Sequence, residues 1–151
     1  MAVNKTKVFF ELPENIDDAG TESLWARATD GGNLILENVP FHVPGVSLED
    51  EITYKIKDDV LYFDKIVKKG GHSTYRILQL CDNPKENFDL YWKPIQDLGG
   101  SYESKIDGSR VLYAIDIPPE ADISRIYQLM EKGEKDGVWH FEEADYNHVA
   151  N

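Results

Sequence analysis

The segment from Lys65 to Arg76 is basic in an otherwise acidic chain, and it carries side chains that suit an anion-binding site. Gly70 and Gly71 can turn backbone N–H groups toward a bound anion, while lysine and arginine supply positive charge. Histidine side chains exchange protons near neutral pH, so His72 could act as a general acid or base. The segment therefore predicts an anion-binding or weakly catalytic turn formed by Lys68, Lys69, His72, Ser73, Thr74 and Arg76.

A structural interpretation of this segment remains open beside the chemical one. Two strands joined by a glycine turn, with lysines directed into water, explain the same residues. The segment has neither Walker nor dinucleotide-binding spacing, and no helix is predicted to begin directly after it. For nucleophilic catalysis, none of Ser23, Ser73 and Ser101 lies in a G-x-S-x-G elbow. The sequence therefore does not predict an enzyme.

The C-terminal stretch WHFEEADYNH places carboxylates and a tyrosine close together. Side chains alternate between the two faces of a strand, so Glu142 and Glu143 would lie on opposite faces. This pattern brings no three good ligands together and lacks zinc spacing, so neither a metal nor another cofactor is predicted. The stretch instead predicts an acidic edge that meets a basic partner, formed by Glu142, Glu143, Asp145 and Tyr146.

Trp25, Phe41 and His42 form another group of aromatic and titratable side chains. They could line a ligand groove. Aromatic residues beside prolines such as Pro40 and Pro44 more often fill core and corner positions. Packing is therefore the preferred interpretation of these three residues.

The chain carries 28 acidic residues against 16 lysines and arginines, which gives a formal net charge of −12. Charge of this sign repels phosphate backbones and anionic membranes, so neither nucleic acid nor a membrane is an expected partner. The same charge attracts basic proteins, although it also fits a protein that is acidic simply to remain in solution. A basic protein is therefore the expected partner.

The length of 151 residues fits one domain or two small subdomains, and 41% hydrophobic residues are enough to form a core. No apolar run approaches the roughly 20 residues that span a bilayer. The N-terminus also lacks the apolar core of a signal peptide. Cys81 has no second cysteine to pair with, and its apolar neighbours favour a buried, inert thiol. We therefore expect a cytoplasmic protein.

Residues 1–72 have the pattern of strands and turns, and we expect them to form a β-rich half. The DGGN sequence at 30–33 and the KDD sequence at 57–59 each separate two apolar runs, which predicts two β-hairpins. Pro40 and Pro44 exclude a central strand between these hairpins. Four or five short strands with tight turns predict a small bent sheet or partial barrel.

Residues 73–151 alternate strand patterns with helical ones. One helix is predicted to begin at Pro84 with Asn83 as its cap, and Pro94 inside it predicts a kink or a late start. A second is predicted after Asp122. The resulting order β-α-β-β-α-β predicts a ferredoxin-like unit, with two helices on one face of an antiparallel sheet. The whole chain is thus expected to be an α+β protein, in which this unit follows the β-rich half.

Six sequence blocks spread over nearly the whole chain form a specific set: KVFFEL, ESLWA, ENVPFHVPGVSLEDEI, GGHSTYR, LYAIDIPPEADI and GVWHFEE. Together they resemble a widespread bacterial family of unknown function. The resemblance implies no established activity and no catalytic residues. It marks His72, Ser73, Thr74 and Arg76 as positions of interest.

In size and charge the chain also resembles immunity proteins, which bind and neutralise a cognate toxin that is often a basic nuclease. An acidic face steers association with such a toxin and can mimic phosphates at its active site. The resemblance implies a protein-binding module whose interface includes Glu142, Glu143, Asp145 and Tyr146. The alternative function is binding of a small anion, or weak catalysis, at the turn from Lys68 to Arg76.

Overall fold

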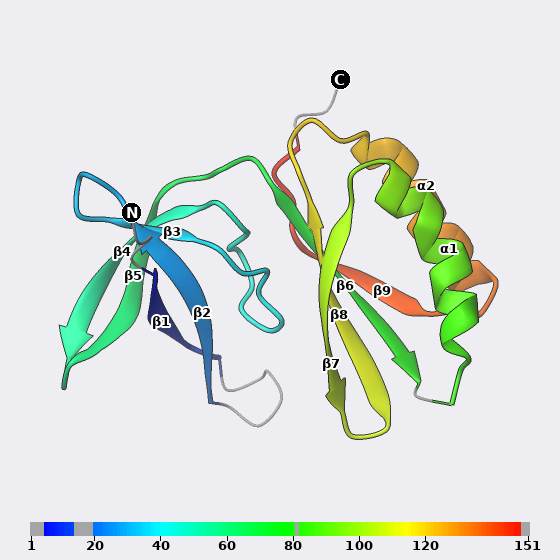
Figure 1. Ribbon diagram of the computed structural model, residues 1–151, viewed down its shortest axis with the longest axis horizontal. Coiled ribbons are helices and arrows are strands. Elements are labelled where there is room, and N and C mark those ends of the chain that lie inside the picture. The colour runs from blue at the N-terminus through cyan, green and yellow to red at the C-terminus, as the bar shows by residue number, and fades with distance from the viewer. Residues whose placement is uncertain (1–4, 14–19, 81, 149–151) are drawn as a thin grey trace.

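The protein consists of a five-stranded barrel followed by a four-stranded sheet with two helices, and the two parts lie side by side (Figure 1). The computed structural model describes residues 5–13, 20–80 and 82–148. Of these residues, 46% are in strands and 19% in helices. Cys81, expected to be a buried thiol, lies outside the described residues.

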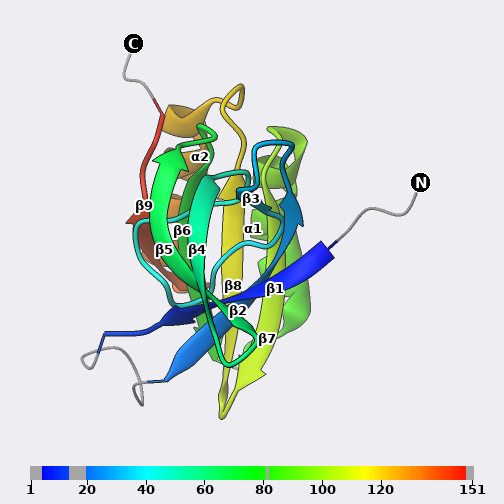
Figure 2. The same ribbon diagram turned by 90° about the vertical axis from the view of Figure 1, so that its left-hand side faces the viewer.

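The N-terminal strands close into a barrel in the order β1-β2-β3-β4-β5 (Figures 1 and 2). Successive strands are antiparallel, so in a series of five the first and last run in the same direction. Strands β1 and β5 therefore pair in parallel and close the barrel. Apolar side chains fill its interior, where Val8, Leu36 and Ile52 are fully buried. The strands are β1 (Lys5–Glu11), β2 (Thr21–Ala28), β3 (Leu34–Leu36), β4 (Glu51–Lys57) and β5 (Val60–Lys68).

Two tight turns set the register of the barrel strands. Between β4 and β5, Asp58 and Asp59 have φ of 52° and 64°, the left-handed conformation that a two-residue hairpin turn requires. Between β2 and β3, Gly32 has φ of 87° and donates its N–H to Thr29 O at 3.1 Å. Strand pairing follows both turns, so both predicted hairpins are confirmed.

The second sheet has the order β7-β8-β6-β9, and all of its strand pairs are antiparallel. Helices α1 (Lys85–Asp97) and α2 (Ile123–Lys135) cover one of its faces (Figure 1). In the core between them, the rings of Phe88 and Tyr113 stack with centroids 3.9 Å apart, and Trp139 meets Phe88 edge-on at 5.4 Å. The strands are β6 (Ser73–Leu80), β7 (Ser101–Asp107), β8 (Arg110–Ile117) and β9 (His140–Asp145).

The two helices follow the sequence signals only in part. Asp122 caps α2 as expected, because its carboxylate accepts the Arg125 N–H at 3.1 Å. Helix α1 begins at Lys85 and continues through Pro94, and its cap residue is Pro84 instead of the expected Asn83. Of the two effects predicted for Pro94, the late start is therefore wrong.

The predicted fold class is also wrong. The chain is mostly β and combines a closed barrel with a separate sheet; it is not an α+β chain in which a bent sheet or partial barrel precedes a ferredoxin-like unit. The barrel closes where Val8 pairs with Leu61 and Phe9 with Tyr62. These partners are far apart in the sequence, and local hydrophobic patterns carry no signal for such pairing.

Gly133 is the point where α2 approaches the core of the sheet most tightly. The residue is buried inside the helix, and a Cβ built on it would overlap the Trp139 ring. That ring is fixed in place because its Nε1–H donates to Met130 O at 2.9 Å. The close approach therefore requires glycine at this position.

Substitution Gly133→Ala is expected to lower the free energy of unfolding by about 1–3 kcal/mol, because overlap with the ring outweighs the helix preference of alanine. Urea denaturation followed by circular dichroism measures the change. The same substitution in a Trp139→Leu background should cost less, since the ring is gone. An unchanged or raised stability of Gly133→Ala would contradict the packing described here.

Candidate functional site

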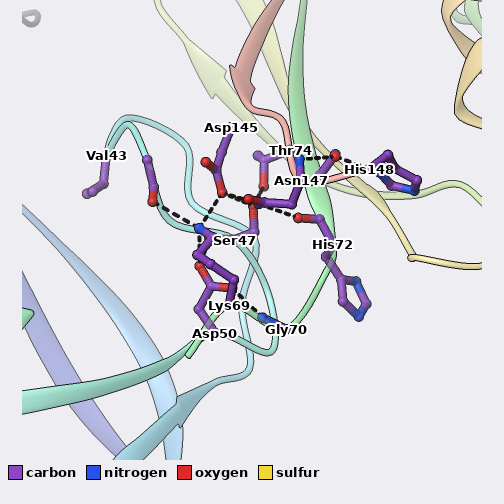
Figure 3. A network of polar contacts seen from close by, with 12 residues as sticks. Val43, Ser47, Asp50, Lys69, Gly70, His72, Thr74, Asp145, Asn147 and His148 are labelled. Atoms are coloured by element: carbon purple, nitrogen blue, oxygen red, sulfur yellow. Dashed lines mark hydrogen bonds and ion pairs between the residues drawn. The ribbon is translucent and has the colours of Figure 1, made fainter. Parts of the chain in front are cut away.

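A network of charged and polar side chains joins the barrel to the sheet (Figure 3). Lys69, between β5 and β6, lies at its centre. The Lys69 Nζ donates to Asp50 Oδ2 at 2.6 Å, to Asp145 Oδ2 at 2.7 Å and to Gly45 O at 3.1 Å. Asp50 and Gly45 belong to the loop between β3 and β4, whereas Asp145 ends β9. One ammonium group therefore binds both parts of the protein.

Asp50 is held in the way that the sequence suggested for an external anion. Its side chain is 0% exposed. It accepts the Gly70 N–H at 2.9 Å and the Ser47 N–H at 2.9 Å, in addition to Lys69. A Cβ on Gly70 would lie 2.5 Å from Glu49 O, so glycine is required for this approach. The glycine turn thus holds an anion, and that anion is a carboxylate of the chain itself.

Asp145 is the second centre of the network, and its side chain is 12% exposed. Its Oδ2 accepts from Ser47 Oγ at 2.7 Å and from Asn147 Nδ2 at 2.7 Å, beside Lys69. The Ser47 hydroxyl also lies 2.6 Å from the Thr74 hydroxyl on β6. Asp145, predicted as part of a partner interface, therefore lies within the junction.

Ser73 and His148 form a serine–histidine pair beside this network. His148 Nε2 lies 2.8 Å from Pro118 O and so carries the proton, which leaves Nδ1 to accept from Ser73 Oγ at 2.6 Å. Activated nucleophiles use such a pair. Ser73 is fully buried, however, and its Oγ also accepts the Asn147 N–H at 2.8 Å. No substrate can reach this oxygen, so the pair instead anchors the segment that follows β9.

His72 contacts Asp116 of β8, with 2.8 Å between Nδ1 and Oδ1. Asp116 is almost completely buried. Loss of water raises the pKa of its carboxyl group above the usual value, and the neighbouring His72 offsets part of this rise. The pair is a titratable contact within the protein.

The six residues predicted to form an anion-binding turn do not surround one common point. Lys68 is exposed at the end of β5, and Arg76 lies further along β6, where its Nη2 donates to Val43 O at 2.8 Å. An external anion at the turn stays a prediction, and it would have to compete with Asp50 and Asp145 for Lys69. Four of the six residues make the contacts described above: Lys69, His72, Ser73 and Thr74.

Sequence reasoning missed four partners of the junction. Ser47 and Asp50 are three positions apart, and this spacing of a hydroxyl and a carboxylate is a common turn signal that could have drawn attention to them. Asn147 and His148 had no comparable signal as junction residues. The four are Ser47, Asp50, Asn147 and His148.

The other residues predicted for a partner interface lie on or beside β9, which forms an edge of the sheet. The Glu142 side chain is 68% exposed. Glu143 accepts a hydrogen bond from the Tyr75 hydroxyl at 2.9 Å, and burial together with this carboxylate raises the pKa of Tyr75. Tyr146 is exposed just after the strand. These three residues, unlike Asp145, are close to the surface.

A hollow of about 680 Å³ lies between α2 and β9. The rings of Tyr127 and Phe141 meet edge-on in it, with centroids 5.5 Å apart. Four glutamates and one lysine surround the two rings, so the hollow combines aromatic surface with excess negative charge. The charged residues are Glu131, Glu134, Lys135, Glu142 and Glu143.

The described part of the chain contains neither a cluster of metal ligands nor a membrane-spanning helix. Within residues 5–13, 20–80 and 82–148, no three His, Cys, Asp or Glu side chains are grouped to hold a metal ion. Over the same residues, neither helix has the length and apolar character needed to cross a membrane.

Replacement of Lys69 by methionine is expected to lower the free energy of unfolding by about 3–5 kcal/mol, because two largely buried carboxylates lose their shared cation. Lys68→Met is the matched control: this neighbouring side chain is exposed. Its loss should change stability by less than about 0.5 kcal/mol. Urea denaturation of the two variants makes the comparison, and equal stabilities would show that the ion pairs at Lys69 do not hold the junction.

Asp116 should make stability depend on pH. Its pKa is raised in the folded state, so the folded state binds its proton more tightly than the unfolded state does, and its contribution falls as pH rises from 3.8. Asp116→Asn removes this pH-dependent contribution to stability and keeps a side-chain oxygen that His72 can contact. The stability of the variant relative to the natural protein should therefore increase with pH above that value. Parallel stability curves from thermal unfolding would contradict this assignment.

The fold and the family of the chain follow from comparison with other proteins. A hypothetical protein from Neisseria gonorrhoeae has a similar structure, with a TM-score of 0.76 and 21% sequence identity over 99% of this chain and 100% of that one. A search of curated proteins found no match. Residues 22–141 match the family model described as domain of unknown function DUF4265. The resemblance to a family of unknown function is thus confirmed, and the chain belongs to the DUF4265 family.

Proposed function

We propose that this protein is a protein-binding module whose hollow between α2 and β9 takes a basic side chain of a partner protein. The observation that carries the proposal is the composition of the hollow, in which glutamates surround the rings of Tyr127 and Phe141. A lysine or arginine side chain fits such surroundings because its stem packs on the rings while its charge meets the carboxylates.

The charge of the whole protein supports the same kind of partner. A net charge of −12 creates a field that accelerates encounter with a basic surface. Exposed carboxylates at the rim set the association rate and the salt dependence, whereas a few buried contacts at the centre set most of the affinity. Tyr127, which is partly exposed on α2, is the expected anchor at the centre.

Within this class, a cognate toxin is the partner that we propose, and the protein would act as its immunity protein. A nuclease needs a basic active site to bind phosphates, and closely spaced carboxylates can occupy such a site in their place. Glu142 and Glu143 point to opposite faces of an edge strand but both border the hollow, so a partner that covers this edge would meet both charges.

The test is titration calorimetry and stopped-flow association with the product of the adjacent gene, at about 50 and 200 mM salt. The natural protein should bind with nanomolar affinity that weakens with salt. Glu131→Lys combined with Glu142→Lys should slow association at least tenfold at low salt. Glu142 also forms an ion pair of 3.6 Å with the largely buried Arg76, so circular dichroism must show that the double variant is folded. Glu131→Lys alone leaves this ion pair in place and should slow association in the same direction.

The matched control carries the same change of charge at another place. Asp82→Lys combined with Glu86→Lys alters two exposed residues at and just before the start of α1. This control variant should slow association by much less than the variant that combines Glu131→Lys with Glu142→Lys. Equal association rates for the two variants would exclude the hollow as the interface, and absence of binding to the neighbouring product would exclude the cognate pair.

A further inference from the structure

A groove lies between the barrel and the face of the sheet that is opposite the helices. It has a volume of about 510 Å³. Leu78 of β6 and Leu112 of β8 are paired across the sheet and form its apolar floor. Phe41, His42 and Pro44, from the loop after β3, form the facing wall. Of the aromatic group noted in the sequence, Phe41 and His42 therefore do line a groove.

The wall of the groove is held rigidly by a buried carboxylate. Glu22 of β2 accepts the backbone N–H groups of Phe41 at 2.6 Å, His42 at 3.0 Å and Val43 at 2.9 Å. Three hydrogen bonds to one carboxylate fix the loop against the barrel. The groove is therefore formed in the protein before any ligand binds.

Arg76 is a largely buried cation at one end of the floor, and its hydrogen-bonding capacity is mostly unused. Its side chain is 12% exposed. The guanidinium has five N–H groups, and among the described residues it donates one hydrogen bond within 3.5 Å, from Nη2 to Val43 O at 2.8 Å. Its buried Nε has no hydrogen-bond partner among these residues. Glu142 lies 3.6 Å from Nη1, too far for a charge-assisted hydrogen bond. Burial lowers the pKa of this guanidinium, and the carboxylates of Glu142 and Glu22 offset part of that effect.

Arg110 lies at the other end of the same floor. In the strand register, Arg76 pairs with Ala114, and the Leu78–Leu112 pair lies between this position and Arg110. Four residues of strand separate the two ends, which is about 13 Å. The apolar floor thus has a cationic group at each end.

Two of the three acidic residues that line the groove can move away from it, whereas Glu143 accepts a hydrogen bond from the Tyr75 hydroxyl at 2.9 Å. Asp107 lies 3.4 Å from Arg110 with its side chain 47% exposed, and Glu142, at 68%, lies 3.6 Å from Arg76. Both carboxylates are exposed and both ion pairs are long, so a bound anion can replace either carboxylate. Lys105 of β7 lies 2.6 Å from His42 Nε2 and 5.0 Å from the centre of the Phe41 ring, so it adds positive charge beside the facing wall.

We infer that this groove binds a small organic anion, whose carboxylate or phosphate group pairs with Arg76 and whose apolar body lies over Leu78 and Leu112. The guanidinium gains the short charge-assisted bonds that Glu142 does not provide. The length of the floor suits a body of about eight carbon atoms. This ligand site differs from the proposed partner hollow because its floor lies on the opposite face of the sheet, and Phe141, Glu142 and Glu143 of β9 border both.

Titration of the full chain with four probes tests the inference by NMR. Octanoate and octyl phosphate distinguish a carboxylate from a phosphate group, octanamide keeps the apolar body without charge, and inorganic phosphate keeps the charge without the body. At least one of the first two should bind with a Kd below about 1 mM and shift the amide signals of His42, Arg76 and His140. Octanamide and inorganic phosphate should each bind at least tenfold more weakly.

Two variants of the groove complete the test, with a third variant as control. Arg76→Met should weaken binding of the preferred probe at least tenfold. Leu112→Gln, in the half-buried floor, should weaken it severalfold because the apolar body loses its contact, and this variant remains informative if Arg76→Met does not fold. Arg125→Met, on the solvent side of α2, should leave binding unchanged. Equal binding of octanoate, octyl phosphate and octanamide would overturn the inference, and so would unchanged binding of the preferred probe by a folded Arg76→Met or by Leu112→Gln.

Discussion

A partly buried cation links the two parts of this protein, together with the hydrogen bonds that Asn38 and Val39 of the barrel side donate to Glu103 of β7. Lys69 lies between Asp50, which has no exposed surface, and Asp145. Removing carboxylates from water costs several kcal/mol per ion, and this cost is offset only when the opposite charge and the hydrogen bonds are well placed. Because the segment from Lys69 to the start of β6 at Ser73 is short, the ion pairs also fix where the sheet begins relative to the barrel.

The two hollows described above depend on this placement. Asp145 holds one end of β9 at the junction, so the rest of that strand runs along the open edge of the sheet. On one side, Arg76 reaches Val43 of the barrel loop and closes the groove. On the other side, Phe141 and Glu143 border α2. A groove with cationic ends and an acidic aromatic hollow therefore share a single strand.

Local structure could be predicted from the sequence, whereas the long-range contacts could not. The turn at Asp58 and the cap at Asp122 depend on neighbouring residues, and both predictions hold. Closure of the barrel between β1 and β5 joins distant segments, which is why the predicted fold class failed. The turn at Gly70 was predicted as a site for an external anion, and this stays a prediction; the Gly70 N–H itself binds Asp50, whose position is set by the tertiary fold.

The net charge of the sequence also cannot show which carboxylates are used inside the fold and which remain available to bind a partner. Glu22, Asp50 and Asp145 hold backbone N–H groups or Lys69 inside the protein, whereas Glu131 and Glu142 face water. Charges of the first kind are shielded from dissolved ions, and those of the second kind are screened within about 10 Å at 0.1 M salt. Added salt should therefore weaken recognition by the acidic surface while the junction persists. The same pairing of carboxylate and cation stabilises the fold where water is excluded and can recognise a partner where water remains.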